Sequence, residues 1–178
     1  MMREQPQSEF AELQTKALHA LEHVDAPVSF RRSYVALQLW EYPAFAKYIS
    51  WTIFTDKDGN MVLKQMIWDR PDDTERFMDP IVGLKKGWHI EPTLTNSETS
   101  LDQSEIVRRI TIANTIAIPL VGIKSTVRLD AVTYGLQIPA SYNSFRLQWW
   151  CNGPEEWREL TTWAADMRTY LLEAFNKP

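Results

Sequence analysis

Apolar and polar residues alternate most regularly within residues 125–175, the stretch around which the rest of the chain is organised. Apolar side chains occupy every second position over 132–138 and again over 145–149. Successive side chains of a β-strand point to opposite faces, so this period of two predicts two strands. The alternation over 127–129 has the opposite phase, and we therefore expect a turn, or an inserted residue, at 130–131.

The second of these strands predicts which of two adjacent tryptophans is buried. Trp149 shares its face with Phe145 and Leu147, so we expect it to lie beneath a helix. Trp150 falls on the opposite face, together with Arg146. The pattern therefore predicts a core residue next to a surface residue.

A long amphipathic helix is expected after this strand. Asn152-Gly153-Pro154 supply a cap and a proline for the first turn, and Glu155 lies where the helix dipole favours negative charge. Apolar residues then recur every three or four positions: Trp157, Leu160, Trp163 or Ala164, Met167 and Leu171. That spacing forms one stripe of an α-helix.

Earlier in the chain the patterns predict two further helices and a hairpin. Apolar residues at helical spacing predict a helix over 8–24 and another over 101–115, although β-branched residues weaken the second. Asp58-Gly59 favours a tight turn, which would join antiparallel strands at 45–55 and 61–69. We therefore expect these two strands to be neighbours in a sheet.

The patterns around this hairpin are shorter. Alternation over 33–40 predicts a strand, and residues 72–78 predict a short helical turn. Residues 88–94 are expected to form another strand, at an edge because Pro92 cannot donate to a ladder. The polar residues 95–100 are expected to be exposed.

These elements predict one α+β domain that spans residues 1–178. The connections between strands are too short for crossover helices, so we expect a mainly antiparallel sheet. The helices are expected to pack on one face of this sheet, the long C-terminal helix among them.

Part of this succession resembles a group of small bacterial proteins of unknown activity. The residues that carry the resemblance are, in order, Ile118-Pro119, Leu129-Asp130, Tyr134-x-Leu136, Phe145 to Trp150 and Pro154-x-x-Trp157. The similarity covers residues 101–175, and Ala131 stands where the pattern of the group has glycine. The resemblance implies this order of helices and strands, and it implies nothing about activity.

Composition narrows the classes of function. A net charge of −4 argues against nucleic-acid binding, which requires a basic face. The single cysteine, Cys151, cannot form a disulfide within the chain, which fits a reducing cytoplasm. No apolar run reaches the ~20 residues of a membrane helix, and residues 1–10 lack the pattern of a signal peptide. We therefore expect a cytoplasmic protein that does not bind membranes.

Motifs for catalysis and cofactor binding are missing from the sequence. It holds no Gly-x-Ser-x-Gly and no glycine-rich phosphate loop, so we expect no cofactor and favour a protein that is not an enzyme. His19 and His23 are spaced so that both could ligate one metal ion from a helix. No third ligand lies nearby in the sequence, so we expect no metal site and a solvated polar face instead.

The polar face of the predicted sheet is the candidate surface for a partner protein. Tryptophan, tyrosine and arginine are enriched among the residues that dominate binding energy in protein interfaces. The residues expected on this face are Tyr34, Gln38, Trp40, Arg146, Gln148 and Trp150. The alternative is that residues 70–100 fold over this face and bury it.

The sequence thus leaves two functions open. The first is a protein-binding or accessory module of the bacterial cytoplasm that uses this aromatic and arginine-bearing face. The second is a small-ligand binder, or an enzyme, with a pocket under the 70–100 loop. The polar groups of that pocket would be Asp130, Tyr134, His89 and Glu91. The partner and the oligomeric state stay open.

Overall fold

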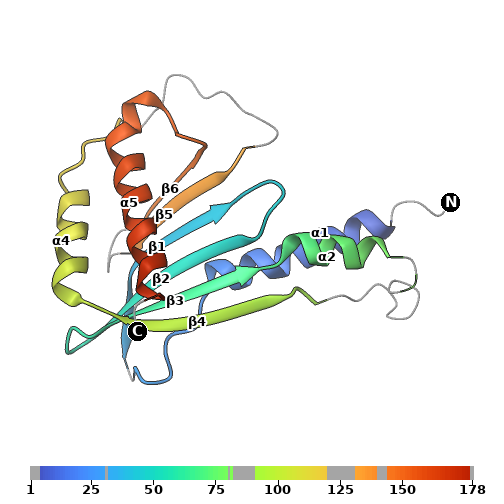
Figure 1. The fold of residues 1–178 in the computed structure, drawn as a ribbon, viewed down its shortest axis with the longest axis horizontal. Coiled ribbons are helices and arrows are strands. Elements are labelled where there is room, and N and C mark those ends of the chain that lie inside the picture. The colour runs from blue at the N-terminus through green and yellow to red at the C-terminus, as the bar shows by residue number, and fades with distance from the viewer. Residues whose placement is uncertain are drawn as a thin grey trace.

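The structure of the protein is a computed structural model, and it has the predicted α+β class. It describes residues 5–30, 32–79, 81, 91–119, 131–139 and 144–176. Figure 1 shows one twisted sheet with helices on either side of it. Within the described residues, no helix combines the length and the apolar character needed to cross a membrane.

The described strands form one six-stranded sheet in which every neighbouring pair is antiparallel. The order across the sheet is β4-β3-β2-β1-β5-β6. The strands are β1 (Ser33–Tyr42), β2 (Tyr48–Asp56), β3 (Met61–Trp68), β4 (Leu94–Leu101), β5 (Thr133–Pro139) and β6 (Ser144–Trp150). The central position of β1, between β2 and β5, joins the two hairpins into one sheet.

The predicted hairpin is confirmed, since β2 and β3 pair from Tyr48 with Trp68 to Thr55 with Met61. The turn is held by the carboxylate of Asp56, whose Oδ1 accepts the backbone N–H groups of residues 58 and 60, each at 2.9 Å. Gly59 has a φ of 85°, a conformation that glycine adopts without strain. The turn residues therefore fix the register, as the sequence indicated.

Residues 95–100 are mostly exposed, as expected, but they belong to a strand and not to the 70–100 loop. These residues form most of β4, which pairs with β3 without a break from Leu94–Trp68 to Leu101–Met61. An edge strand is held by backbone hydrogen bonds, and both of its faces can be exposed, so its side chains need not alternate in hydrophobicity. The part of the expected 88–94 strand that precedes residue 91 lies outside the described residues.

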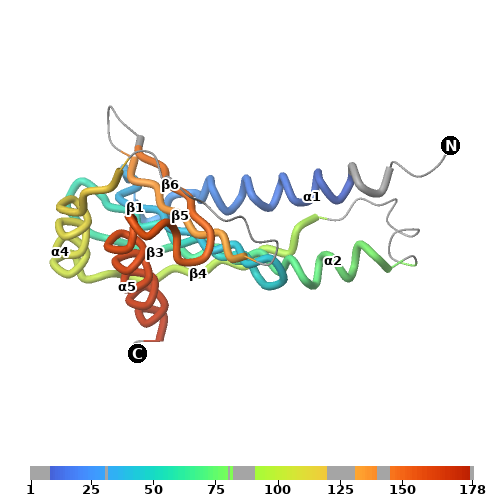
Figure 2. Tube along the Cα trace, turned by 90° about the horizontal axis from the view of Figure 1, so that it is seen from above, coloured from blue at the N-terminus to red at the C-terminus, as the bar shows by residue number. Residues whose placement is uncertain are grey.

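The helices cover both faces of the sheet, which differs in one respect from the sequence expectation. α4 (Gln103–Ala113) and α5 (Arg158–Ala174) lie on one face, whereas α1 (Gln5–Glu22) crosses the other, as Figure 2 shows. The amide of Gln38, whose side chain points away from α5, donates to the carbonyl oxygens of Leu21 at 3.0 Å and Glu22 at 3.2 Å. A buried polar side chain thus anchors the end of α1.

The main core lies between the sheet and α5. The buried side chains of α5 recur at helical spacing, and they are Leu160, Trp163, Ala164, Met167, Leu171 and Ala174. They pack against Leu37, Leu39 and Trp51 of the central strands. Trp149 belongs to the same cluster and is 5% exposed, so its predicted burial is confirmed.

A second buried centre joins α2 (Arg70–Met78) to the sheet. The carboxylate of Asp73 is fully buried and accepts hydrogen bonds from Trp68 Nε1, Thr93 N and Thr93 Oγ1, each at 2.7 Å. It also pairs with the guanidinium of Arg76. Burial raises the pKa of the Asp73 carboxyl, but the bonds from Thr93, Arg76 and Trp68 outweigh burial and hold that pKa below its ordinary value.

Candidate functional site

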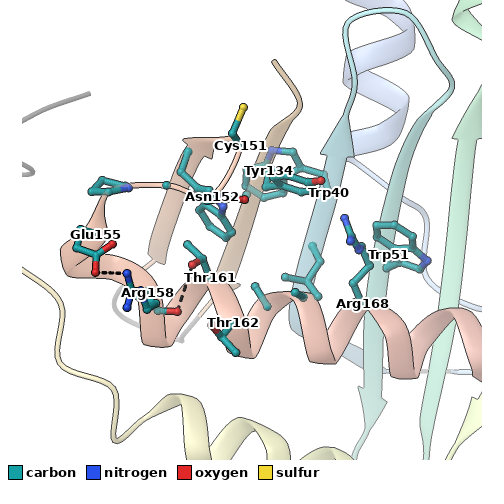
Figure 3. A pocket seen from close by; sticks show the side chains of 17 residues that line it. Trp40, Trp51, Tyr134, Cys151, Asn152, Glu155, Arg158, Thr161, Thr162 and Arg168 are labelled. Carbon is teal, nitrogen blue, oxygen red and sulfur yellow. Dashed lines mark hydrogen bonds and ion pairs between the residues drawn. The ribbon is translucent and has the colours of Figure 1, made fainter. Parts of the chain in front are cut away.

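α5 carries a second stripe of residues that shares Ala164 with its core stripe. Thr161, Ala164, Ala165 and Arg168 are spaced by three, one and three positions, so they share one side of the helix. The first three are small, and α5 therefore leaves space between itself and the sheet. This space is a pocket of about 460 Å³ that all four residues line (Figure 3).

The walls of the pocket are mostly aromatic on the side of the sheet. The lining residues from the strands are Leu39, Trp40, Trp51, Tyr134, Gly135 and Trp149. The rings of Tyr134 and Trp149 stack with their centroids 6.4 Å apart. A ligand would therefore lie between flat rings on one side and a helix of small side chains on the other.

One end of the pocket is formed by the loop that leads from β6 to α5. Cys151 and Gly153 have φ angles of 50° and 70°, so the chain reverses within a few residues. A Cβ atom at Gly153 would lie 2.9 Å from Thr161 Cγ2 and 3.2 Å from Trp149 Cδ1. Glycine at this position thus satisfies both the backbone conformation and the close approach to the wall.

Polar side chains surround this loop end. Glu155 and Arg158 form an ion pair at the surface. The hydroxyl of Thr161 donates to the carbonyl oxygen of residue 158 at 3.2 Å, and the amide of Asn152 offers both a donor and an acceptor. In Figure 3 the sulfur of Cys151 points away from the other labelled side chains. This end is therefore polar and has a balanced charge.

The opposite end is formed by Arg168, which rises from α5 towards the sheet (Figure 3). Its Nη1 donates to Glu41 Oε2 at 2.8 Å, and its guanidinium lies 5.0 Å from the centroid of the Tyr134 ring. Burial lowers the pKa of Arg168, but the Tyr134 hydroxyl and the Glu41 carboxylate outweigh burial and raise it. Arg168 is thus a permanent cation with a neutralising partner.

The pocket beneath α5 is not the one expected under the 70–100 loop, and it contains one of the four residues named for that pocket. Tyr134 lines the pocket beneath α5. Glu91 does not line this pocket, and its carboxylate accepts a hydrogen bond at 3.0 Å from Lys16 of α1. Asp130 and His89 lie outside the described residues.

Of the residues expected on the protein-binding face, some are exposed and others are buried. Gln148 and Trp150 are exposed, with Trp150 at 40%. Tyr34 is also exposed, but the register of β1 shifts between Val35 and Leu37, so Tyr34 no longer shares the face of Trp150. The guanidinium of Arg146 pairs with Glu22 of α1 at 2.6 Å and remains partly accessible. Residues near β6 therefore stay available on this face.

Trp40 is not available to a partner, because it is only 3% exposed. The expectation that it faces solvent is wrong. Arg146 lies over its ring at 4.7 Å from the centroid. The ring also packs against Gly135, where a Cβ atom would come within 2.1 Å of Trp40 Cζ2. Because Gly135 has no side chain, the Trp40 ring can lie directly against the strand at this position. On this face the end of α1 is held by Gln38, whereas the alternative named residues 70–100 as the cover, and residues 80 and 82–90 of that segment lie outside the described residues.

Metal ligation was the remaining possibility. The rings of His19 and His23 stack with centroids 4.2 Å apart. Among the residues that the structure describes, no group of three or more potential His, Cys, Asp or Glu ligands could hold a metal ion.

The small side chains of α5 were the signal that sequence reasoning missed. Ala164 was predicted only as a member of the apolar stripe, and Ala165 was not singled out, although both line the pocket together with Trp149 and Tyr134. Comparison with protein-family models, with curated proteins and with solved structures found no match.

Proposed function

We propose that this protein binds a small molecule in the pocket between α5 and strands β5 and β6. The observation that carries the proposal is the pocket itself. Its volume of about 460 Å³ falls in the range of small-molecule sites, and such sites combine mostly apolar or aromatic walls with a few polar groups. The residues of β5 and α5 supply both aromatic walls and polar groups.

The chemistry of the lining supports binding rather than catalysis. The described lining residues include no histidine and no aspartate, and their one carboxylate, Glu155, is exposed and paired with Arg158. General acid–base catalysis needs a titratable group positioned next to the reacting atoms, and nucleophilic catalysis needs a base beside the nucleophile. Cys151 has no such base among the lining residues.

A blocking substitution tests this proposal. Ala165 is exposed at the rim of the pocket, so Ala165→Trp should reduce the free volume without disturbing the core stripe of α5. Leu172→Trp is the matched control, because Leu172 is an exposed residue of α5 that does not line the pocket. A fragment library would be screened by ligand-observed nuclear magnetic resonance against the natural protein and both variants.

We expect fragments that bind the natural protein and Leu172→Trp but bind Ala165→Trp at least about tenfold more weakly. Circular dichroism would confirm that both variants keep their fold. Fragments that bind all three proteins equally, or a library without any binder, would contradict the proposal.

A second candidate is protein binding at the exposed edge of the other face. The observation that favours it is that Trp150 and Gln148 remain exposed beside the partly accessible Arg146. A photo-crosslinking amino acid at position 148 would test it in host cells. A specific crosslinked partner that disappears in Trp150→Ala would support this function, and crosslinks that are unchanged in that variant would contradict it.

A further inference from the structure

The polar groups of the pocket also indicate which class of ligand it takes, an inference that rests on the proposed function. We infer that the ligand is an uncharged, flat aromatic molecule whose carbonyl oxygen, in an amide or a lactam, accepts a hydrogen bond from Arg168. Glu41, which lies behind Arg168, is then the residue that excludes charged relatives of this molecule.

The paired charges around the pocket favour an uncharged ligand. Arg168 is neutralised by Glu41, and their side chains are only 27% and 24% exposed. Arg158 is neutralised by Glu155 at the other end of the pocket. A carboxylate ligand would approach Arg168 next to the carboxylate of Glu41, in a region where water screens charge poorly. A cationic ligand would meet Arg168 itself, so the pocket disfavours both signs.

The N–H donors of Arg168 favour a ligand with a hydrogen-bond acceptor. A guanidinium has five N–H donors and no acceptor. The hydrogen bond from Nη1 of Arg168 to Glu41 uses one of them, and the Tyr134 hydroxyl lies beside the same group. Donors therefore remain for a ligand acceptor, and a neutral carbonyl oxygen accepts them without adding charge.

The shape of the pocket favours a flat ligand. Tyr134 and Trp149 present stacked rings from β5 and β6, and Ala164 and Ala165 face them from α5. Rings of this kind favour a flat partner in an offset stack. The small alanine side chains leave room for that partner, while Thr161 and Asn152 can bind further polar groups at the loop end.

The test uses three probes of nearly equal size and different charge, which are naphthamide, naphthoate and naphthamidine. Their affinities for the natural protein would be measured by tryptophan fluorescence, since Trp149 and Trp51 line the pocket. We expect naphthamide to bind at least about tenfold more tightly than either ion. This ranking needs no variant and is therefore independent of any folding defect.

Glu41→Gln tests the cause of the ranking. Removing the carboxylate leaves the charge of Arg168 uncompensated, so the affinity for naphthoate should rise by about tenfold or more while that for naphthamide changes little. Glu105→Gln is the matched control, because Glu105 is exposed to a similar extent, also pairs with an arginine and does not line the pocket, so it should leave the ranking unchanged. Glu41→Gln combined with Arg168→Gln should weaken naphthamide and give no gain for naphthoate.

Three outcomes would overturn the inference. In the natural protein, naphthoate or naphthamidine could bind most tightly, which contradicts an uncharged ligand. In Glu41→Gln, the ranking could stay unchanged, which contradicts the role of Glu41. If none of the probes binds, the ligand class is wrong; the proposed function fails with it only when the fragment screen also lacks a binder that is sensitive to Ala165→Trp.

Discussion

Asp73 and Glu41 are both removed from most of the surrounding water, yet they are used very differently. Asp73 is fully buried, and its two oxygens are shared among Trp68, Thr93 and Arg76. Glu41 is about a quarter exposed and pairs with Arg168, which lines the pocket. The first is a closed network in which the donors are matched to one carboxylate. The second leaves donors facing a cavity.

This difference separates a structural group from a binding group. A buried polar network stabilises a fold only when each member is satisfied, and its loss leaves charges unpaired in a region without water. A pair beside a cavity can lose one member at lower cost, because water or a ligand can reach the other. Substitutions of Asp73 and Glu41 should therefore differ in how much they destabilise the fold.

Asp73→Ala should destabilise the protein by about 3–5 kcal/mol, the usual cost of removing one partner of a buried charged pair. The substitution leaves the indole N–H of Trp68 without its acceptor, and the guanidinium of Arg76 keeps its ion pair with Asp72 but loses the one with Asp73. Denaturant melts of the variant and the natural protein would measure the change. A loss below about 1 kcal/mol, which is typical of surface substitutions, would show that the network is not closed.

The same network predicts a loss of stability in acid. The pKa of Asp73 is lower in the folded protein than its ordinary value of about 3.9, so its contribution is complete above that pH. The contribution is lost as the pH falls through the folded pKa, because the proton then binds more readily to the unfolded chain. Asp73→Asn should therefore have a shallower dependence of unfolding free energy on pH below about 4 than the natural protein. Equal slopes would contradict this role.

Glu41→Gln should destabilise by about 1–2 kcal/mol, less than Asp73→Ala, since the pair with Arg168 is partly solvated and the amide can still accept a hydrogen bond. Thermal and denaturant melts would give the value. A loss as large as that of Asp73→Ala would mean that the pair is a structural group, and the contrast between the two carboxylates would disappear.

Trp150→Ala should cost about 1 kcal/mol or less, because its side chain is 40% exposed on the face away from α5. Trp149→Ala, one residue earlier, should cost about 3–5 kcal/mol through the cavity that it leaves in the core. Denaturant melts of both variants would compare them. Similar large losses would show that the face near Trp150 is also covered, and protein binding there would lose its support.

The sequence predicted the parts of the fold in which one periodicity dominates. The hairpin at Asp58-Gly59 and the burial of Trp149 followed from turn chemistry and alternation. β4 was not predicted, because an exposed edge strand needs no apolar pattern. The sequence did not predict which face of the sheet α1 covers, because the residue that anchors α1, Gln38, is polar and looks like a surface residue.

The candidate site was predicted less well than the fold. Tyr134 was expected to line a pocket under the 70–100 loop, whereas the pocket that it lines lies beneath α5. The cavity depends on side chains that are absent or small, such as Ala165 and Gly153, and a sequence pattern reports such residues only as helix or turn formers. The pairing of Glu41 with Arg168 joins residues distant in the chain, so no local pattern could indicate it.

The most direct test of the account is a crystal structure of the protein with naphthamide. The account predicts the aromatic rings between α5 and the rings of Tyr134 and Trp149, with the carbonyl oxygen about 3 Å from a nitrogen of Arg168. Naphthamide bound elsewhere on the protein, or bound in this pocket with its carbonyl oxygen turned away from Arg168, would contradict it.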